Sequence, residues 1–325
     1  MVWEVILILY LTYLFVSLVL FIFPSAIHSK HATFAKRILG KKNKIAVFSH
    51  RGGALEAPEN SMTAFRHSID IGITGIETDI MKTRDNVYVT SHDSRLMRLT
   101  GQQDKFSEID YEDIGPFLSV MNVHMGNYEL KDKEKEEKPG KLLDLFKAVK
   151  NTNIVLSLDV KTGEIEDIRN VLRLCKEYHI HDRVIIGNMF KFNVKELKKE
   201  FGNEINFFFP GRQVFYVFIY FMTGLLPFIP LKHDFFMITH AFHDIMNNPF
   251  FDGRWFLKCV FGFIRCLWPF IALLNWHLKR RGIFVFYWTV NSIKDVETSL
   301  KLGAQGVITD KPEFIKEYLE SKDLF

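Results

Sequence analysis

Short apolar runs alternate with amphipathic segments along most of the chain. Such runs are typical of strands buried on both faces in a parallel sheet. Eight runs are predicted to be strands: residues 45–48, 75–80, 87–90, 154–161, 184–186, 205–209, 283–289 and 306–309. Helices are predicted over residues 60–72, 142–150, 164–178, 192–201, 293–302 and 313–320. This order favours an α/β fold, a TIM (β/α)8 barrel formed by residues 45–325.

The N-terminus follows a different pattern, because residues 5–23 contain no charged side chain. A helix needs about 20 apolar residues to cross the hydrocarbon core of a membrane. A cleaved signal peptide is the alternative, but it would place basic residues before the apolar run and a small-residue cleavage site after it. Here Glu4 precedes the run and a basic stretch follows it. We therefore predict a transmembrane anchor over residues 1–27.

A basic linker is predicted over residues 28–44. Its positive charges are Lys30, Lys36, Arg37, Lys41, Lys42 and Lys44. Positive flanking residues stay on the cytosolic side of a membrane. We therefore expect the bulk of the chain to lie on the cytosolic face.

The regular alternation stops at residues 210–278, which form an apolar insertion. Residues 214–231 are uncharged, but a single crossing there would separate the last two strands from the others and prevent the barrel from closing. Two crossings would need Lys258 and Arg265 in lipid, which is costly. We predict a hydrophobic, membrane-associated insertion that dips into one leaflet or lines an acyl-chain groove. Ordinary packing of its helices around the barrel is the alternative, although the chain has 32 phenylalanines to cover.

Charge and cysteine content narrow the class of protein. The 42 basic and 38 acidic residues give a net charge of +4, which is too balanced to indicate a nucleic-acid-binding protein. Three cysteines provide no disulfide framework. This cysteine content and the absence of any N-x-Ser/Thr sequon fit a cytosolic domain.

Polar residues follow the early strands at their carboxyl ends. His50 comes after the first strand, Glu77 and Asp79 lie on the second, and His92 follows the third. Residues two apart in a strand share a face, so both carboxylates are expected inside the barrel. Unpaired carboxylates are costly to bury, and one divalent cation, Mg²⁺ or Ca²⁺, would compensate for that cost.

The strand at residues 154–161 repeats this arrangement. Asp159 and Lys161 share a face, so Asp159 adds a third carboxylate and Lys161 can meet a phosphate oxygen. Each of these residues alone has an ordinary structural explanation. Together, at the carboxyl ends where barrels carry their active sites, they indicate a catalytic site.

These residues form an ordered set of motifs that resembles the signature of glycerophosphodiester phosphodiesterases. The motifs are His50-Arg51-Gly52, Pro58-Glu59-Asn60-Ser61, Glu77-x-Asp79, His92-Asp93, Trp288-Thr289-Val290-Asn291 and Gly306-Val307-Ile308-Thr309-Asp310-Lys311-Pro312. The resemblance spans residues 45–318. The N-terminal anchor and the phenylalanine-rich segment resemble the membrane-anchored lysophospholipase D subgroup.

The resemblance implies roles for individual residues. His50 and His92 match the two catalytic histidines, one a general base and one a general acid. Glu77, Asp79 and Asp159 match the cation ligands, and His92 is a further possible ligand. The family commonly has Glu where this chain has Asp159, so this shorter side chain is expected to reach the cation directly or through water.

The remaining matched residues concern the substrate. Arg51 and Lys161 match phosphate-binding positions, whereas Glu59, Asn60 and Trp288 match residues that line the pocket.

The function implied is that of a lysophospholipase D. Such an enzyme releases the head-group alcohol, such as choline or ethanolamine, from lysophospholipids and leaves lysophosphatidic acid. It also acts on N-acyl glycerophosphoethanolamines, and the membrane bilayer is its other partner. The subgroup suggests the endoplasmic reticulum or perinuclear membrane. The alternatives are a phosphodiesterase for water-soluble glycerophosphodiesters, a phospholipase C of the same barrel type, and a non-catalytic membrane-tethered scaffold.

Overall fold

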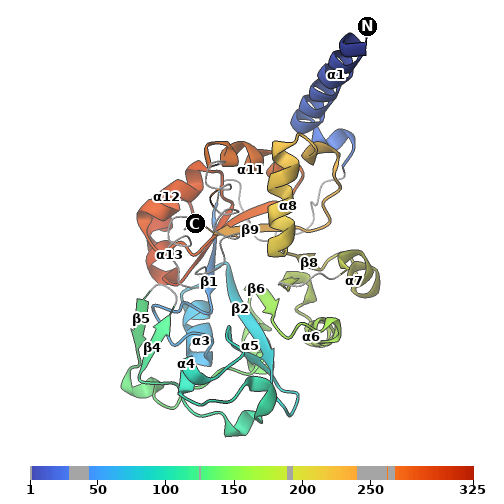
Figure 1. Ribbon diagram of the computed structural model, residues 1–325. Helices are drawn as coiled ribbons and strands as arrows, with labels where there is room; N and C mark the ends of the chain where they lie inside the picture. Colours follow the sequence, from blue (N-terminus) through green and yellow to red (C-terminus); the bar gives the residue numbers. More distant parts are fainter. Residues whose placement is uncertain (1, 29–43, 124–125, 189–192, 240–261, 263–267) are drawn as a thin grey trace.

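The computed structural model describes residues 2–28, 44–123, 126–188, 193–239, 262 and 268–325 (Figure 1). Most of the predicted basic linker, residues 28–44, therefore lies outside the described residues. So does the part of the predicted insertion that contains Lys258 and Arg265.

Eight parallel strands form the centre of the molecule, which confirms the predicted (β/α)8 barrel. They are β1 (Ala46–His50), β2 (Gly75–Lys82), β6 (Val155–Val160), β7 (Val184–Gly187), β8 (Asn206–Phe207), β9 (Phe235–Thr239), β10 (Phe284–Trp288) and β11 (Gly306–Thr309). Their order is β8-β7-β6-β2-β1-β11-β10-β9. A parallel bridge between Phe208 and Phe235 joins the two edge strands and closes the barrel.

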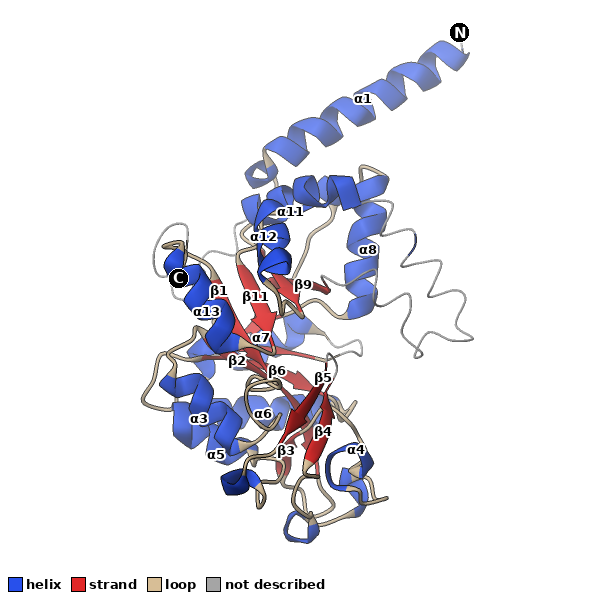
Figure 2. Ribbon diagram, turned by 90° about the vertical axis from the view of Figure 1, so that its left-hand side faces the viewer, coloured by secondary structure: helices blue, strands red, loops and turns tan. Residues whose placement is uncertain are grey.

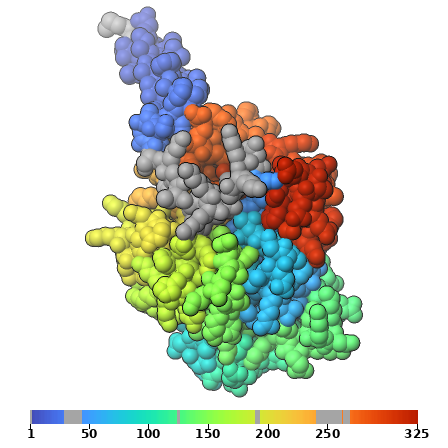
Figure 3. Space-filling model, turned by 180° about the vertical axis from the view of Figure 1, so that it is seen from behind, coloured from blue at the N-terminus to red at the C-terminus, as the bar shows by residue number. Residues whose placement is uncertain are grey.

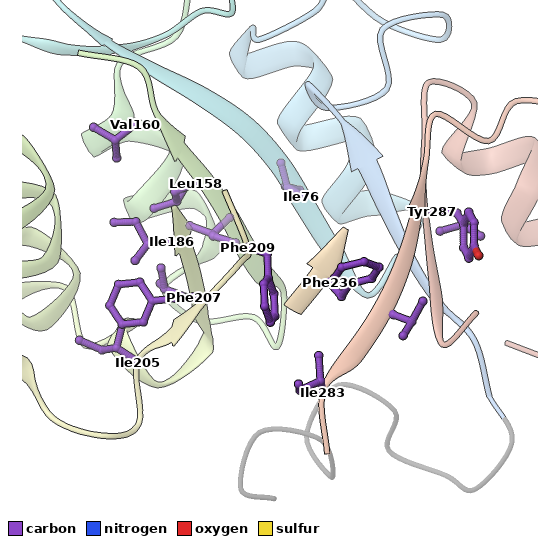
Figure 4. Close-up of a cluster of buried hydrophobic side chains, with 14 of the residues drawn as sticks. Ile76, Leu158, Val160, Ile186, Ile205, Phe207, Phe209, Phe236, Ile283 and Tyr287 are labelled. Carbon is purple, nitrogen blue, oxygen red and sulfur yellow. The ribbon is translucent and has the colours of Figure 1, made fainter. Parts of the chain in front are cut away.

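Helices surround the barrel and follow most of its strands, as Figure 1 shows. They are α3 (Met62–Asp70), α5 (Leu142–Val149), α6 (Ile165–Glu177), α7 (Val194–Phe201), α8 (Gly211–Met222), α11 (Ile271–Arg280), α12 (Ile293–Lys301) and α13 (Pro312–Ser321). Side chains on the outer faces of the strands pack against them. Figure 4 shows part of this layer, with Ile76 of β2 and Leu158 and Val160 of β6.

One predicted barrel strand was wrong. Residues 87–90 were expected to be the third parallel strand, but β3 (Tyr88–Thr90) pairs antiparallel with the end of β2. A parallel neighbour needs a crossover of at least about a dozen residues, and only residues 83–87 separate these two strands. Asn86 has a positive φ of 62°, as the turn of a hairpin requires. β3 is therefore an extension on the rim of the barrel.

The strand that replaces it is β9, which lies inside the predicted insertion at residues 210–278. β9 pairs with β10 over five residues, from Phe235–Phe284 to Thr239–Trp288. This segment therefore contributes part of the barrel wall, in addition to α8 and α11. None of the described helices in it is long enough to cross a membrane.

Aromatic rings fill the interior at the amino-terminal end of the barrel. Phe48, Phe235, Phe284 and Phe286 form a buried inner cluster with small and branched residues from the other strands. Glycines face these rings across the barrel: a Cβ at Gly75 would lie 2.5 Å from the Phe48 ring. These four of the chain's 32 phenylalanines therefore pack inside the barrel.

The segment between β3 and α5 forms a small subdomain with its own apolar cluster. It contains α4 (Met97–Thr100) and the antiparallel strands β4 (Val120–Val123) and β5 (Gly126–Glu129). Because it follows the carboxyl ends of β2 and β3, it lies on the side of the barrel where the candidate residues converge. Figure 2 shows β4 and β5 at the end of the molecule remote from the N-terminal helix.

The N-terminal helix, α1 (Val2–Ile22), projects from the opposite end of the molecule (Figures 2 and 3). Within the described residues, it is the one helix with the length and apolar composition to cross a membrane. Ser17 is its only buried residue. Its carboxyl-terminal half packs against the end of α8 and against α11, at the amino-terminal end of the barrel.

Candidate active site

The candidate site lies at the carboxyl ends of the barrel strands, above the aromatic layer. Strand periodicity puts it there: on β1 the inward residues are Ala46, Phe48 and His50, and on β2 Glu77 and Asp79 follow the inward-facing Gly75. The register then pairs His50 with Glu77, and Asp79 with Asp159 of β6. Residues that are distant in sequence thus meet at one end of the barrel.

Two residues outside the expected set hold the imidazole of His50. Its Nδ1 lies 2.6 Å from Oδ1 of Asp310, at the end of β11. The other oxygen of Asp310 accepts a hydrogen bond from Nδ2 of Asn291 at 2.8 Å. Although burial opposes a charge on the ring, the carboxylate of Asp310 raises the pKa of His50 above its usual value. Nε2 remains on the side of Glu77, 4.0 Å from Oε2.

The three predicted ligands have unequal proton affinities. Burial and the neighbouring carboxylate of Asp79 raise the pKa of Glu77 to about 7. Burial also opposes ionisation of Asp79, but the nearby Lys161, the histidines and Arg51 outweigh it and lower the pKa of Asp79 to about 2. Burial raises the pKa of Asp159 despite its contact with Lys161. Three carboxylates within one low-dielectric site therefore compete for ionisation.

Lys161 bridges two of these carboxylates. Its Nζ lies 2.5 Å from Oδ2 of Asp159 and 3.1 Å from Oδ1 of Asp79. Burial disfavours the ammonium charge, yet the two aspartates raise the pKa of Lys161 above its usual value. Lys161 therefore carries its charge within the site, where it can also meet an anionic group.

Two oxygens of the site fit a divalent cation. Oδ2 of Asp79 and Oδ1 of Asp159 are buried and accept no hydrogen bond from the described residues; Nε of Arg51 lies 3.6 Å from Oδ2 of Asp79. Oxygen donors of this kind are the ligands that Mg²⁺ and Ca²⁺ prefer. Glu77, Asp79 and Asp159 would hold such an ion.

Arg51 occupies a turn that places both its backbone and its side chain in the site. Its φ is 53°, and Gly52 and Gly53 also have positive φ values. A Cβ at Gly52 would lie 2.8 Å from that of Ala64, so the turn needs glycine there. The backbone N–H of Arg51 donates to Oε2 of Glu77 at 3.2 Å, which orients that carboxylate.

Glu59 lies behind Arg51 and is fully buried. Its carboxylate accepts from Nη1 of Arg51 at 3.2 Å and from Nη2 of Arg98 at 2.5 Å. Arg98 belongs to α4 of the subdomain, and its Nη1 also donates to the backbone oxygen of Asn122 at 2.8 Å. Glu59 therefore lies between two arginines, and its place in the lining of the substrate pocket stays a prediction.

His92 reaches the site from the loop after β3. The backbone N–H of Ser91 donates to the backbone oxygen of Asp79 at 3.0 Å and fixes this loop beside the ligands. Nδ1 of His92 lies 2.9 Å from Oδ1 of Asp93, whose other oxygen accepts from Nε of Arg98 at 2.5 Å. A charge on His92 lowers the pKa of Asp79, as does a charge on His50. The two histidines therefore both lie near Asp79.

The two other predicted pocket residues occupy different surroundings. Asn60 is buried, and its Oδ1 accepts from Oγ1 of Thr78, which lies on the outer face of β2. Trp288 continues the inward series of Phe284 and Phe286 at the end of β10, and it is exposed at the mouth of the barrel. Contact of Trp288 with substrate stays a prediction, and the same holds for Asn60.

A second group of possible ligands lies between α3 and α13. Ligand atoms of Glu56, His67 and Glu313 lie within 4.8 Å of one another. The sequence motifs did not single out this group. Glu56 already accepts the backbone N–H groups of Glu313 and Phe314 at the start of α13. Its position is therefore explained by helix capping.

Comparison with known proteins gives consistent results. Residues 50–199 match the glycerophosphoryl diester phosphodiesterase family. Human lysophospholipase D GDPD1 is 31% identical over 310 residues, covering 95% of this chain and 94% of its own length. Human lysophospholipase D GDPD3 is 29% identical over 288 residues, covering 86% of each chain.

Solved structures share the fold. A glycerophosphodiester phosphodiesterase of Thermotoga maritima superimposes with a TM-score of 0.55 at 19% identity, over 86% of this chain and 100% of its own. A phosphodiesterase of Oleispira antarctica, solved with the product sn-glycerol-3-phosphate, gives 0.59 at 17% identity, over 85% and 97%. With the sequence match to the human relatives over nearly its whole length, the chain belongs to the glycerophosphoryl diester phosphodiesterase family and is a phosphodiesterase.

Proposed function

We propose that this phosphodiesterase is a lysophospholipase D. From lysophospholipids it releases the head-group alcohol, such as choline or ethanolamine, and leaves lysophosphatidic acid. From N-acyl glycerophosphoethanolamines it releases the N-acyl ethanolamine and leaves glycerol phosphate. Two human relatives with that name, at 31% and 29% identity, support the substrate class.

The observation that carries the proposal is the pair of histidines beside a buried carboxylate set. Oδ1 of Asp310 accepts a hydrogen bond from Nδ1–H of His50, so Nε2 is the ring nitrogen that can exchange a proton inside the site. Nδ1 of His92 lies 2.9 Å from Oδ1 of Asp93, which orients this second ring. One histidine can therefore accept a proton while the other donates one.

The substrate's own 2-hydroxyl is the proposed nucleophile. One histidine removes its proton as its oxygen attacks phosphorus. The bond between phosphorus and the head-group oxygen breaks, and the other histidine protonates that leaving oxygen. A cyclic phosphate results, which water then opens with the proton transfers reversed.

The charged side chains hold the phosphate during these steps. Arg51 and Lys161 supply positive charge to its oxygens. A divalent cation held by Glu77, Asp79 and Asp159 would polarise a phosphate oxygen and stabilise developing negative charge. The choice between Mg²⁺ and Ca²⁺ is part of the test.

The test is product analysis with purified full-length protein and lysophosphatidylcholine. We expect choline and lysophosphatidic acid, loss of turnover with a chelator, and recovery with Mg²⁺ or Ca²⁺ added separately. His50→Ala should lower turnover by at least about 10²-fold, because it removes a general acid–base group. His179→Ala is the matched control and should retain activity, since His179 is exposed in the turn after α6.

Other products would contradict the proposal. Monoacylglycerol with phosphocholine would indicate a phospholipase C. A folded, cation-loaded protein without turnover of any diester would support a non-catalytic scaffold.

A water-soluble glycerophosphodiester is the second candidate substrate. The site lies at the end of the barrel opposite α1, which would suit a substrate arriving from water. Glycerophosphocholine in the same assay separates the two. Turnover of this compound alone would reject the lysolipid assignment and retain the phosphodiesterase.

We also propose that α1 is retained as a membrane anchor, in the endoplasmic reticulum or perinuclear membrane. Hydrogen bonds from Tyr13 and Ser17 to the barrel domain support retention, because a cleaved signal peptide would lose them. The basic flank after α1 supports a cytosolic catalytic domain. In sealed microsomes, added protease should then degrade the barrel; its protection would place the barrel in the lumen.

A further inference from the structure

The corner between α8 and the short helix η6 (Leu226–Phe228) packs directly against α1. We call residues 220–231 the α8–η6 corner. The Tyr13 hydroxyl donates to the backbone oxygen of Thr223 at 2.5 Å, and the Ser17 hydroxyl donates to that of Gly224 at 2.6 Å. The ring of Tyr13 also stacks on Phe228, with centroids 6.1 Å apart. The corner therefore contacts the middle of α1, well before its end at Ile22.

The position of Ser17 on α1 gives the depth at which the α8–η6 corner would lie in a membrane. Ser17 precedes Ile22 by five residues, which is about 7 Å along a helix at 1.5 Å per residue. The 21 residues of α1 measure about 31 Å, close to the thickness of a hydrocarbon core. If α1 spans the membrane, Gly224 lies about 7 Å inside the hydrocarbon.

The backbone of the corner is suited to that environment. A helix end leaves carbonyl oxygens without intrahelical partners, and in lipid each of them needs a donor from the protein. Besides Thr223 and Gly224, which are bonded to α1, three more carbonyls in the corner have side-chain partners from outside it. His28 Nε2 lies 2.7 Å from the oxygen of Pro227, and the Arg281 guanidinium donates to the oxygens of Leu226 and Ile229.

The side chains around the corner are apolar and exposed. Residues 213–231 carry no charge. Met222 and Leu225 are exposed on the corner, and Phe270, Leu273 and Trp276 are exposed on the neighbouring α11. Phe21 of α1 lies against Trp276, so these surfaces are continuous with the anchor.

A change from apolar to charged residues marks the edge of this surface. The guanidinium of Arg280 lies over the ring of Trp276, 4.9 Å from its centroid. Tryptophan and arginine are typical of the boundary between hydrocarbon and head groups. The apolar surface therefore ends at the last turn of α11.

We infer that the α8–η6 corner and the exposed face of α11 are embedded in the leaflet that holds the carboxyl-terminal half of α1, in contact with phospholipid acyl chains. The inference rests on the proposed anchoring by α1. The barrel domain then sits in one leaflet beside α1 with a fixed orientation, instead of being tethered by a flexible link.

The test measures depth with a fluorescent probe on single cysteines. The full-length background carries Cys259→Ser and Cys266→Ser, and Cys175 is buried. Leu225→Cys reports on the corner, Leu11→Cys on the anchor, and Leu118→Cys on the distant subdomain. Leu118 is a matched control, because it is 41% exposed and Leu225 is 40% exposed. Each labelled protein is placed in phosphatidylcholine vesicles that contain lipids spin-labelled on the acyl chain.

We expect the probes at positions 225 and 11 to be quenched several-fold more than the probe at 118. A probe at 225 that behaves like the one at 118, with position 11 still quenched, would overturn the inference and leave the anchor intact. Loss of quenching at position 11 would reject the anchor and the inference together. Lysolipid turnover is measured on each labelled protein, so failure of the proposed substrate would be seen separately from the depth result.

Discussion

The imidazole of His50 is held by a residue 260 positions away in sequence. Pairing of β1 with β11, through Ser49 and Thr309, brings Asp310 beside it. Asn291 donates to Asp310 from the segment after β10, so three barrel strands determine one ring orientation. Asp310 touches the histidine and is assigned a positioning role.

Asp310→Asn should lower kcat by about 10²-fold, with a smaller change in KM, because the ring loses its orienting carboxylate. The carboxylate raises the pKa of His50, so its removal should lower that pKa. The limb of the pH–rate profile that belongs to His50 should therefore move to lower pH. Asp295→Asn, a substitution on the outside of the barrel, is the control. An unchanged profile in a folded Asp310→Asn protein would contradict the positioning role.

The sequence predicted the site residues that stand in recognisable motifs. It missed the residues that reach the site only because the chain folds. His50, Glu77, Asp79, His92 and Asp159 converge because strand periodicity and register follow from the chain itself. Asp310 stood inside a recognised motif, and its inward direction could have been deduced from Ile308, two residues earlier. Arg98 gave no local signal, because it lies in an irregular segment and acts through contacts distant in sequence.

Two of the barrel strands show why strand prediction from the sequence was incomplete. The predicted number of barrel strands was right, but one member was β3, which belongs to a hairpin, and β9 was overlooked. The short connection between β2 and β3 was sufficient to exclude a parallel pair. β9 was hidden because its residues, Phe235–Thr239, lie within a long apolar segment in which strand and helix periodicities cannot be distinguished.

Gly75→Ala should destabilise the barrel. A Cβ at this position would lie 2.5 Å from the Phe48 ring and 2.7 Å from the backbone oxygen of Val155, and the second contact cannot rotate away. We expect a loss of about 1–3 kcal/mol in the free energy of unfolding, which chemical denaturation would measure. Gly211→Ala is the control, because nothing lies within 4 Å of its Cβ position. Equal stability of the two variants would contradict tight packing inside the barrel.

In the whole molecule, α1 and the candidate active site lie at opposite ends of the barrel, and this arrangement bears on function. α1 contacts the amino-terminal end of the barrel, whereas the histidines and carboxylates lie at the carboxyl ends of the strands. The sequence predicted both parts, but it gave no indication of their relative direction. That direction depends on which turns of α8 and α11 meet α1, and these contacts exist only in the folded chain.

This arrangement predicts how the enzyme obtains its substrate. If α1 anchors the chain as proposed, the mouth of the barrel faces away from the membrane, and turnover should follow the concentration of free lysolipid monomers. Adding phosphatidylcholine vesicles at constant total lysolipid should then slow the reaction in proportion to the monomers withdrawn. A rate that instead follows the lysolipid density in the anchoring membrane would contradict this.

A lipid substrate would then have to leave its bilayer before it reacts, and the cost of leaving the bilayer would select among substrates. Withdrawing each methylene from hydrocarbon costs about 0.8 kcal/mol, so a second acyl chain roughly doubles the barrier to escape. Lipids with one chain exchange through water readily, whereas those with two remain in place. Selectivity for single-chain lipids would then arise before binding, from the direction in which the barrel faces.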